Sequence, residues 1–337
     1  MKLENFPWKH GLKEAVQPKI ITSVEELVKH PLFDYVVAKS PVYGRFEDMN
    51  RQITRNIIDN LYVLYRKDTL DQFATCTKRY KVRQNSELLM FANNILKANV
   101  VGINPKIVFA SISNRGARLY IVINISFTQG ADFDVSHNII LYAGHDTKLG
   151  INFLYIPFII LHGSQSLGIR VSSISPITKK EFLISFKHTA SIMETFQKVY
   201  GFLNNVAQYT KILDSILTAF SERRVTHTDI VQIIAKTFMP DKDYIEFERS
   251  KLSYYSVSET LPKSLVLIMT EINNSARRID NPSLLFLYIK TSEILKRNSS
   301  DDFLDAIRDK NTDYLSRMFI ILYKIITHEK EKIALPA

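Results

Sequence analysis

Two alternating apolar runs on either side of a turn constrain the fold of this chain more than any other feature of its sequence. Within residues 106–126, apolar side chains alternate with polar or small ones, first in KIVFASIS and again in RLYIVINIS. This period of two is typical of strands. The runs meet at Asn114-Arg115-Gly116, whose residue types favour a tight turn. The sequence therefore predicts an antiparallel β-hairpin.

Other segments around this hairpin are rich in β-branched and aromatic residues, which favour strands. They are residues 33–37, 61–68, 73–82, 137–144, 151–161, 168–174 and 181–188. Segments 61–68 and 73–82 are expected to pair with each other across the turn between them. We expect residues 33–188 to form one mostly antiparallel sheet system.

Helical patterns are sparse before residue 188 and almost unbroken after it. Ser23 predicts the N-cap of a short helix, and Asn85 begins another that ends near Asn99. A long helix is expected from about residue 189, and later helices at about 227–238, 260–279, 283–297, 301–309 and 312–330. The prediction is an α+β fold with a mostly antiparallel, β-rich N-terminal half and a helical C-terminal half, divided into residues 1–222 and 223–337.

The long helix carries an apolar stripe with alternating spacings of four and three. The stripe consists of Ile192, Phe196, Val199, Leu203, Val206, Thr210, Leu213, Leu217 and Phe220. Such a heptad pattern is typical of a coiled coil and favours a homo-oligomer. A long helix that packs on its own sheet or on later helices needs the same stripe, so both interpretations stay open.

Composition excludes several classes of protein. The single cysteine, Cys76, cannot form an intrachain disulfide or a CxxC zinc site, and no GxGxxG or Walker-type loop occurs. The first residues lack the apolar run of a signal peptide, and the longest apolar stretch, residues 151–161, is about half a bilayer span. We therefore expect a cytoplasmic protein with no membrane segment, no metal and no cofactor.

The net charge of +10 and the isoelectric point near 9.4 favour an anionic partner such as nucleic acid, although many proteins carry such a surplus for solubility alone. The densest basic and aromatic cluster lies on the two segments expected to pair, and it consists of Arg66, Lys67 and, within TKRYKVR, Lys78, Arg79, Tyr80, Lys81 and Arg83. If TKRYKVR is a strand, Arg79, Lys81 and Arg83 share one face and can contact phosphates. Tyr80 can stack on a base of a single strand, or it can belong to the core instead.

The predicted nucleic-acid contacts are Lys78, Arg79, Tyr80, Lys81, Arg83, Arg115, Arg118 and Lys187. Of these, Arg115, Arg118 and Lys187 extend the surface beyond the main cluster, and Arg170, Lys179 and Lys180 are further cations that can extend it.

Histidines give a weaker, enzymatic signal. His145-Asp146 and His188-Thr189 can supply a base or a metal ligand if the two pairs meet in space. Adjacent residues on a strand point to opposite faces, which disfavours a direct His145–Asp146 pair outside a turn. His188 is better explained as a hydrogen-bonding group where the long helix begins, with Thr189 as N-cap. Ser164 lacks the glycines of a nucleophile elbow.

Several of these strings, in this order, resemble a phage/plasmid-like family known as domain of unknown function 932. PWKHGL resembles its Pro-Trp-His-Gly-Leu opening, RYKVRQN its strand-to-helix junction, GHD a Ser-His-Asp-Gly turn and KHT the Arg-His-Thr start of a long helix. The residues that match are Trp8, Gln84, Asn85, His145, Asp146, His188 and Thr189. The resemblance covers roughly residues 6–220 and implies a phage or mobile-element origin and a shared fold.

Three functions follow as hypotheses. The preferred one is a non-enzymatic protein that binds nucleic acid, preferably single-stranded DNA, in phage replication or strand annealing. The alternative is a structural or protein-interaction component that assembles through its helices. The third is a hydrolase or nuclease centred on His145, Asp146 and His188.

Overall fold

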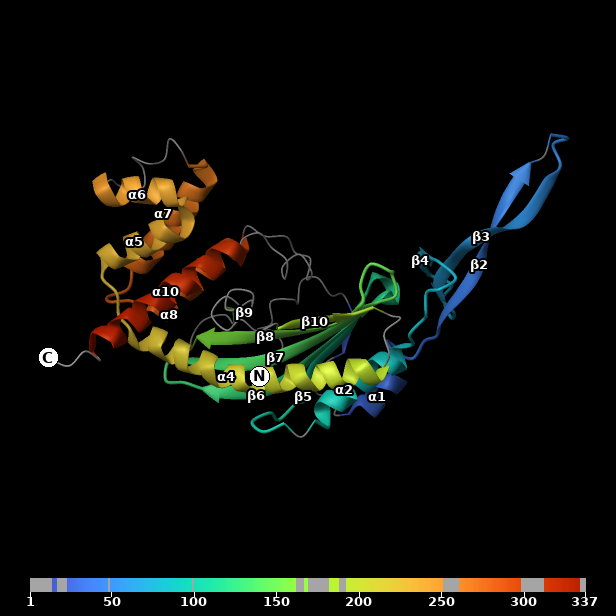
Figure 1. The fold of residues 1–337 in the computed structure, drawn as a ribbon, viewed down its shortest axis with the longest axis horizontal. Coiled ribbons are helices and arrows are strands. Elements are labelled where there is room, and N and C mark those ends of the chain that lie inside the picture. Colours follow the sequence, from blue (N-terminus) through green and yellow to red (C-terminus); the bar gives the residue numbers. More distant parts are fainter. Residues whose placement is uncertain are drawn as a thin grey trace.

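The chain has an α+β fold, with antiparallel sheets in its N-terminal half and helices mostly in its C-terminal half (Figure 1). The computed structural model describes residues 14–16, 23–47, 49–98, 100–161, 167–168, 182–187, 192–250, 261–297 and 312–333. The fold class predicted from the sequence is confirmed.

A seven-stranded antiparallel sheet forms the centre of the molecule. Its strand order is β1-β5-β6-β7-β8-β10, and β9 pairs with β8. The bounds are Glu14–Val16 for β1, Lys106–Ser113 for β5, Arg118–Gln129 for β6, Phe133–Gly144 for β7, Ile151–Leu161 for β8, Leu167–Gly168 for β9 and Leu183–Phe186 for β10. The hairpin predicted at residues 106–126 is confirmed as β5 and β6, joined by a 3-10 turn at Asn114–Gly116.

Both faces of this sheet are apolar in its middle strands. On one face, Ile121 of β6 lies opposite Leu141 of β7, which lies opposite Phe153 of β8. On the other face, Val122, Ile140 and Leu154 form the matching row. Because successive residues of a strand point to opposite faces, each row contributes to a separate hydrophobic cluster.

Helices cover the face that carries Ile121. They are α1 (Val24–Lys29), α2 (Asn85–Leu96) and the long α4 (Ile192–Glu222), which runs along the sheet in Figure 1. Ser23 accepts a hydrogen bond from the Glu26 amide, which confirms the predicted N-cap of α1.

The heptad stripe of α4 packs within the chain. Among its members with described side chains, Val199, Leu203, Val206, Thr210, Leu213, Leu217 and Phe220 are buried. Intramolecular packing therefore explains the stripe, and a self-association surface on these residues would require the helix to leave its own core.

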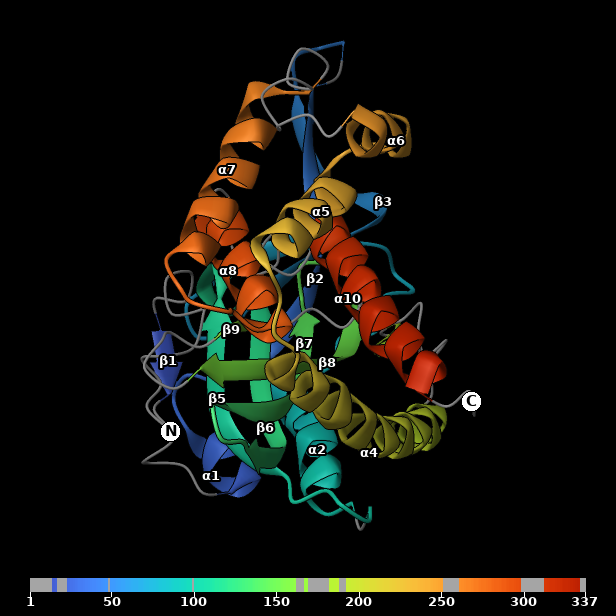
Figure 2. The ribbon, with the colours of Figure 1, turned by 90° about the vertical axis from the view of Figure 1, so that its left-hand side faces the viewer.

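The remaining helices form a layer that joins the far end of α4 (Figure 2). They are α5 (His227–Phe238), α6 (Asp241–Ser250), α7 (Lys263–Arg277), α8 (Leu284–Arg297) and α10 (Thr312–Ile333). The ring of Phe319 contacts Phe220 of α4 and Tyr288 of α8, at centroid distances of 5.2 and 5.7 Å. α6 is absent from the sequence prediction, whereas the predicted helix at 301–309 lies outside the described residues. No described helix has both the length and the apolar character needed to cross a membrane.

A second, three-stranded sheet projects from the body as an arm (Figure 1). Its strands are β2 (Val37–Glu47), β3 (Ile53–Arg66) and β4 (Gln72–Cys76), in that order. The expectation of a single sheet over residues 33–188 is therefore wrong. β4 pairs with β3 only between Tyr62 and Tyr65, so the outer part of the arm is a two-stranded ribbon.

Candidate nucleic-acid interface

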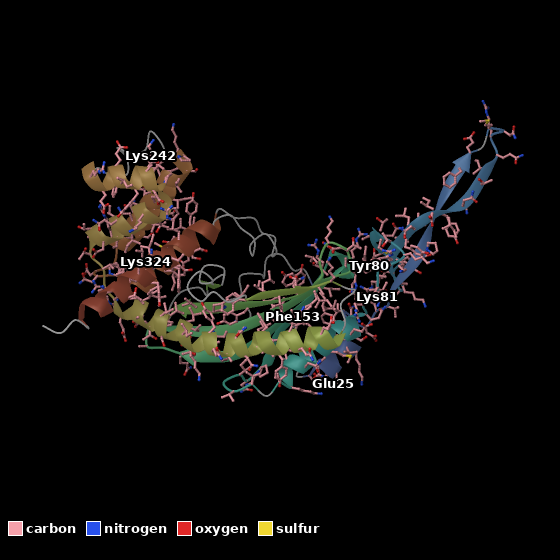
Figure 3. All side chains as sticks on the ribbon, in the orientation of Figure 1. Glu25, Tyr80, Lys81, Phe153, Lys242 and Lys324 are labelled. Atoms are coloured by element: carbon pink, nitrogen blue, oxygen red, sulfur yellow. The ribbon has the colours of Figure 1, made fainter. Side chains whose placement is uncertain are left out.

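The sequence-predicted residues that are described gather where the arm joins the body. Three elements meet there: the segment between β4 and α2, the β5–β6 turn and the β7–β8 turn. Tyr80 and Lys81 mark this junction in Figure 3. Lys187 follows β10 and lies against Gly150, just after the β7–β8 turn, and so belongs to the same end of the sheet.

The segment from Lys78 to Arg83 is not a strand, because β4 ends at Cys76. The Lys39 ammonium group donates hydrogen bonds to the carbonyl oxygens of Lys78 and Tyr80, at 2.9 and 2.8 Å. The Lys78 amide donates to the Asn60 side chain at 3.1 Å. Side chains, rather than a neighbouring strand, thus form hydrogen bonds with the backbone of this segment. The predicted alternation of two faces in TKRYKVR is wrong.

Three cations of this segment remain exposed. Lys78, Arg79 and Lys81 face solvent and form no ion pair with another described residue. Arg83, by contrast, pairs with Glu87 at 2.9 Å, and its side chain is mostly buried. The first three are therefore available to a ligand, whereas Arg83 is held by Glu87 at the start of α2.

Tyr80 is half-buried rather than presented to solvent. Its hydroxyl oxygen is buried, and desolvation raises the pKa of the phenol. The hydroxyl end of Tyr80 therefore belongs to the junction, and the stacking of its ring on a base stays a prediction.

The two arginines of the predicted surface on β5–β6 have different roles. Arg118 forms a 2.7 Å ion pair with Asp146, and both side chains are largely buried. Arg115 lies in the tight turn with 81% of its side chain exposed, 3.2 Å from Asp71 of the arm. The exposed Arg115 can therefore contact a ligand, whereas Arg118 is occupied by its largely buried ion pair with Asp146.

The four described residues of the family-like strings form a structural hub. The Gln84 amide accepts a hydrogen bond from the Val37 N–H and donates one to the Val37 carbonyl, both at 3.0 Å. Asn85 donates to the Phe33 carbonyl at 3.0 Å, and its side-chain oxygen lies 2.9 Å from Nε2 of His145. The His145 ring in turn stacks on Phe73 of β4 at 6.0 Å.

These contacts explain the His145-Asp146 pair without catalysis. His145 is buried between α2 and β4, and Asp146 binds Arg118 while its other oxygen accepts from the amides of Lys148 and Leu149. The adjacent side chains serve different partners in a turn. Trp8, Ser164, Arg170, Lys179, Lys180, His188 and Thr189 lie outside the described residues.

Further contacts fix the arm on the body. The Tyr35 hydroxyl donates to the Gly116 carbonyl at 2.5 Å, and the Arg66 guanidinium lies 4.1 Å from the Tyr35 ring centroid. Gly116 has a φ of 99°, and a Cβ there would lie 2.8 Å from the Tyr35 hydroxyl. Only glycine fits this close approach without strain. Arg66 also holds Asp68 with two hydrogen bonds, which lower the pKa of that carboxyl group.

The exposed cations around this junction form what we call the basic collar. Its members are Lys67, Lys78, Arg79, Lys81, Arg115, Lys148 and Lys187. Residues 37–84 alone contain ten Lys and Arg against five Asp and Glu, so half of the chain's net charge of +10 belongs to this segment. Sequence reasoning identified the collar except for Lys148, whose position in the β7–β8 turn is visible only in the fold.

Sequence reasoning missed a buried polar network between the sheet and α4. His137 of β7 lies 2.6 Å from the Tyr155 hydroxyl and 2.9 Å from Asp214 of α4. Thr128 donates to the second oxygen of Asp214 at 2.7 Å. His137 is fully buried, and burial raises the pKa of Tyr155, so this network fastens α4 to the sheet away from solvent.

Two features bear on catalysis and metal binding. The described residues contain no group of three or more His, Cys, Asp and Glu side chains that could hold a metal ion. A depression of about 410 Å³ lies on the helical layer, lined by Lys236, Asp241, Arg317 and Lys324 together with Ser316, Ile320 and Ile321. None of these residues belongs to the collar or its hub.

Comparisons with protein-family models, with curated proteins and with solved structures gave no match to this chain. The resemblance to the phage/plasmid-like family therefore stays a prediction, and the functional argument rests on the geometry above.

Proposed function

We propose that this chain is a non-enzymatic nucleic-acid-binding protein whose contact surface is the basic collar. The observation that carries the proposal is that Lys67, Lys78, Arg79 and Lys81 are exposed at the arm base and form no ion pair with another described residue. Such cations bind phosphates and release the counterions of the nucleic acid. This binding requires no particular base sequence.

The dimensions of the collar support a polymeric ligand. Lys67 lies just beyond the end of β3, and Lys78 is bonded to Asn60 near the middle of that strand. Seven residues of β-strand span roughly 23 Å, so a backbone with phosphates every few ångströms can contact several collar cations at once. A single small anion would contact only one or two of them.

Binding in this proposal is led by phosphates rather than by stacking, because the Tyr80 hydroxyl is buried. Single-stranded DNA, the ligand preferred from the sequence, is the first to test, with duplex DNA as the comparison. The same proposal places the protein in the cytoplasm and gives it a role in the replication or strand annealing of a phage or mobile element.

The test is fluorescence anisotropy with labelled single-stranded and duplex oligonucleotides across a salt series. In the triple variant K78Q/R79Q/K81Q, we expect roughly tenfold to a hundredfold weaker binding and a salt slope reduced by about 2 for a single strand. The matched control is K242Q/K263Q/K324Q, which removes the same charge from exposed lysines of the helical layer. Figure 3 labels two of them, Lys242 and Lys324.

Wild-type protein that does not bind at low salt would contradict the proposal. Equal losses in the two triple variants would also contradict it, because they would show an effect of net charge rather than of the collar.

A second function, that of a structural or protein-interaction component, is favoured by a different observation. The outer arm exposes large apolar side chains at Tyr43, Phe46, Met49, Ile53 and Ile57. These residues are far less suited to phosphate than the collar is.

A further inference from the structure

The outer arm exposes apolar side chains that no other described element packs against. Over residues 43–57, β2 and β3 pair only with each other among the described strands. Tyr43 is 61% exposed, Ile57 56% and Ile53 49%. A two-stranded ribbon is marginally stable alone in water, and clustered exposed apolar residues mark an interaction surface.

The charge of the outer arm differs from that of the collar. Residues 43–59 contain three basic residues, Arg45, Arg51 and Arg55, and three acidic ones, Glu47, Asp48 and Asp59. A surface with balanced charge does not attract a polyanion, but it can be complementary to itself.

One face of the ribbon orders these groups in rows. Tyr43 lies opposite Ile57, Arg45 opposite Arg55, and Glu47 opposite Ile53. Directly opposite residues share a face, as do residues two apart along a strand. Ile58 belongs to the other face, because its Cγ1 lies 3.2 Å from where a Cβ on Gly44 would be. Strand alternation then assigns Asp59, the next residue of β3, to the face of Ile57, beside the register shift between Pro41 and Tyr43.

The Arg45–Arg55 row indicates a missing partner. Like charges directly opposite each other destabilise a hairpin, and neither arginine forms an ion pair with another residue that the structure describes. On the same face, this row lies between the acidic groups Asp59 and Glu47. A second ribbon in the opposite direction can therefore place an acidic side chain over the arginine row.

We propose that this face of the arm packs against the same face of a second copy of the chain, related by a two-fold axis near the Tyr43–Ile57 row. The axis brings two Tyr43–Ile57 rows together, and it places the arginine row of each copy over Asp59 of the other. Such an isologous contact satisfies both copies at once.

Face-to-face packing suits this arm better than the addition of a strand to β2. β2 is an edge strand that contains Pro41, and its register with β3 shifts between Pro41 and Tyr43. Proline and an irregular register are the features that prevent a further strand from pairing with an edge. The apolar face, rather than the backbone of β2, is thus the attachment surface.

Charge exchange tests this proposal on the full chain. Size-exclusion chromatography with light scattering should show a dimer of the wild type that dissociates on dilution. In R45E/R55E, glutamates face Asp59 of the other copy, and in E47R/D59R only cations face each other. Each variant alone should bind itself roughly a hundredfold more weakly.

An equimolar mixture of the two variants should regain the dimer, because each supplies the charge that the other lacks. The control K242E/K263E changes exposed lysines of the helical layer and should leave the wild-type dimer intact. Circular dichroism of each variant verifies that the body is folded.

A wild type that stays monomeric at high micromolar concentration would overturn the proposal and would leave the arm to a different protein. A dimer that persists in both arm variants would overturn it as well, because another surface would then hold the copies together.

Discussion

The seven-stranded sheet and the arm are both antiparallel, yet they meet opposite surroundings. In the sheet, Phe153 is fully buried between strands and helix, and the rings of Phe91 and Phe186 lie 6.0 and 6.2 Å away. In the arm, Tyr43 pairs with Ile57 across the two strands, yet both side chains face solvent. Strand pairing alone therefore tells little about stability, which depends on what covers each face.

The largest expected difference between the two regions comes from equivalent truncations. Phe153→Ala should lower the free energy of unfolding by about 3–5 kcal/mol, because it leaves a cavity in the core. Tyr43→Ala should change it by no more than about 0.5 kcal/mol in the monomer, where the side chain is exposed. Urea denaturation followed by circular dichroism measures both, and similar losses would show that the arm is part of the cooperative core.

The hub between the two regions should give the next largest effect. Asn85→Ala removes the hydrogen bond to Phe33 and leaves buried His145 without this partner, so we expect a loss of about 2–4 kcal/mol. Asn94→Ala, on the exposed side of the same helix, is the matched control. Limited proteolysis of the arm would report whether the hub also fixes its position. A variant as stable as the control would refute the importance of the hub.

Alkaline pH should lower the stability of the sheet and of α4 by a smaller amount. Burial raises the pKa of Tyr155 and of Tyr209 well above 10. Because these phenols keep their protons in the folded state while the unfolded chain loses them from pH 10, stability is intact below pH 10 and falls as the pH rises. The loss should be about 1.4 kcal/mol per pH unit for each tyrosine.

Tyrosinate absorbance and circular dichroism, recorded together, measure this effect. The absorbance of the buried tyrosines should appear only as the helical signal is lost. Complete titration of all tyrosines in a protein that keeps its helices would contradict their burial.

The parts of the fold that the sequence predicted are those with local causes. The β5–β6 hairpin has alternating runs and its own turn, and α2 has an apolar stripe that begins at Asn85. β2 was missed because its outer half is exposed and therefore has no alternation to detect. α6 was missed because its sequence, DKDYIEFERS, is mostly polar.

The candidate site was predictable in composition but not in geometry. The sequence identifies Lys78, Arg79 and Lys81 but wrongly predicts a strand for their segment, because the deciding contacts come from Lys39 and Asn60, which are distant in sequence. The pairing of Arg118 with Asp146 and the approach of His137 to Asp214 span 28 and 77 positions. No pattern in a single sequence connects such residues.

Gln84 fixes both the position and the orientation of the arm where its first strand begins. Its amide offers one acceptor and one donor to the same residue, Val37, from which the first strand of the arm departs. A carboxylate in the same place would keep the acceptor and turn the donor into a repelling oxygen against the Val37 carbonyl. Replacing this amide by a carboxylate would thus loosen the arm where its first strand begins, while the contacts of Tyr35 with Gly116 and Arg66 still hold its base.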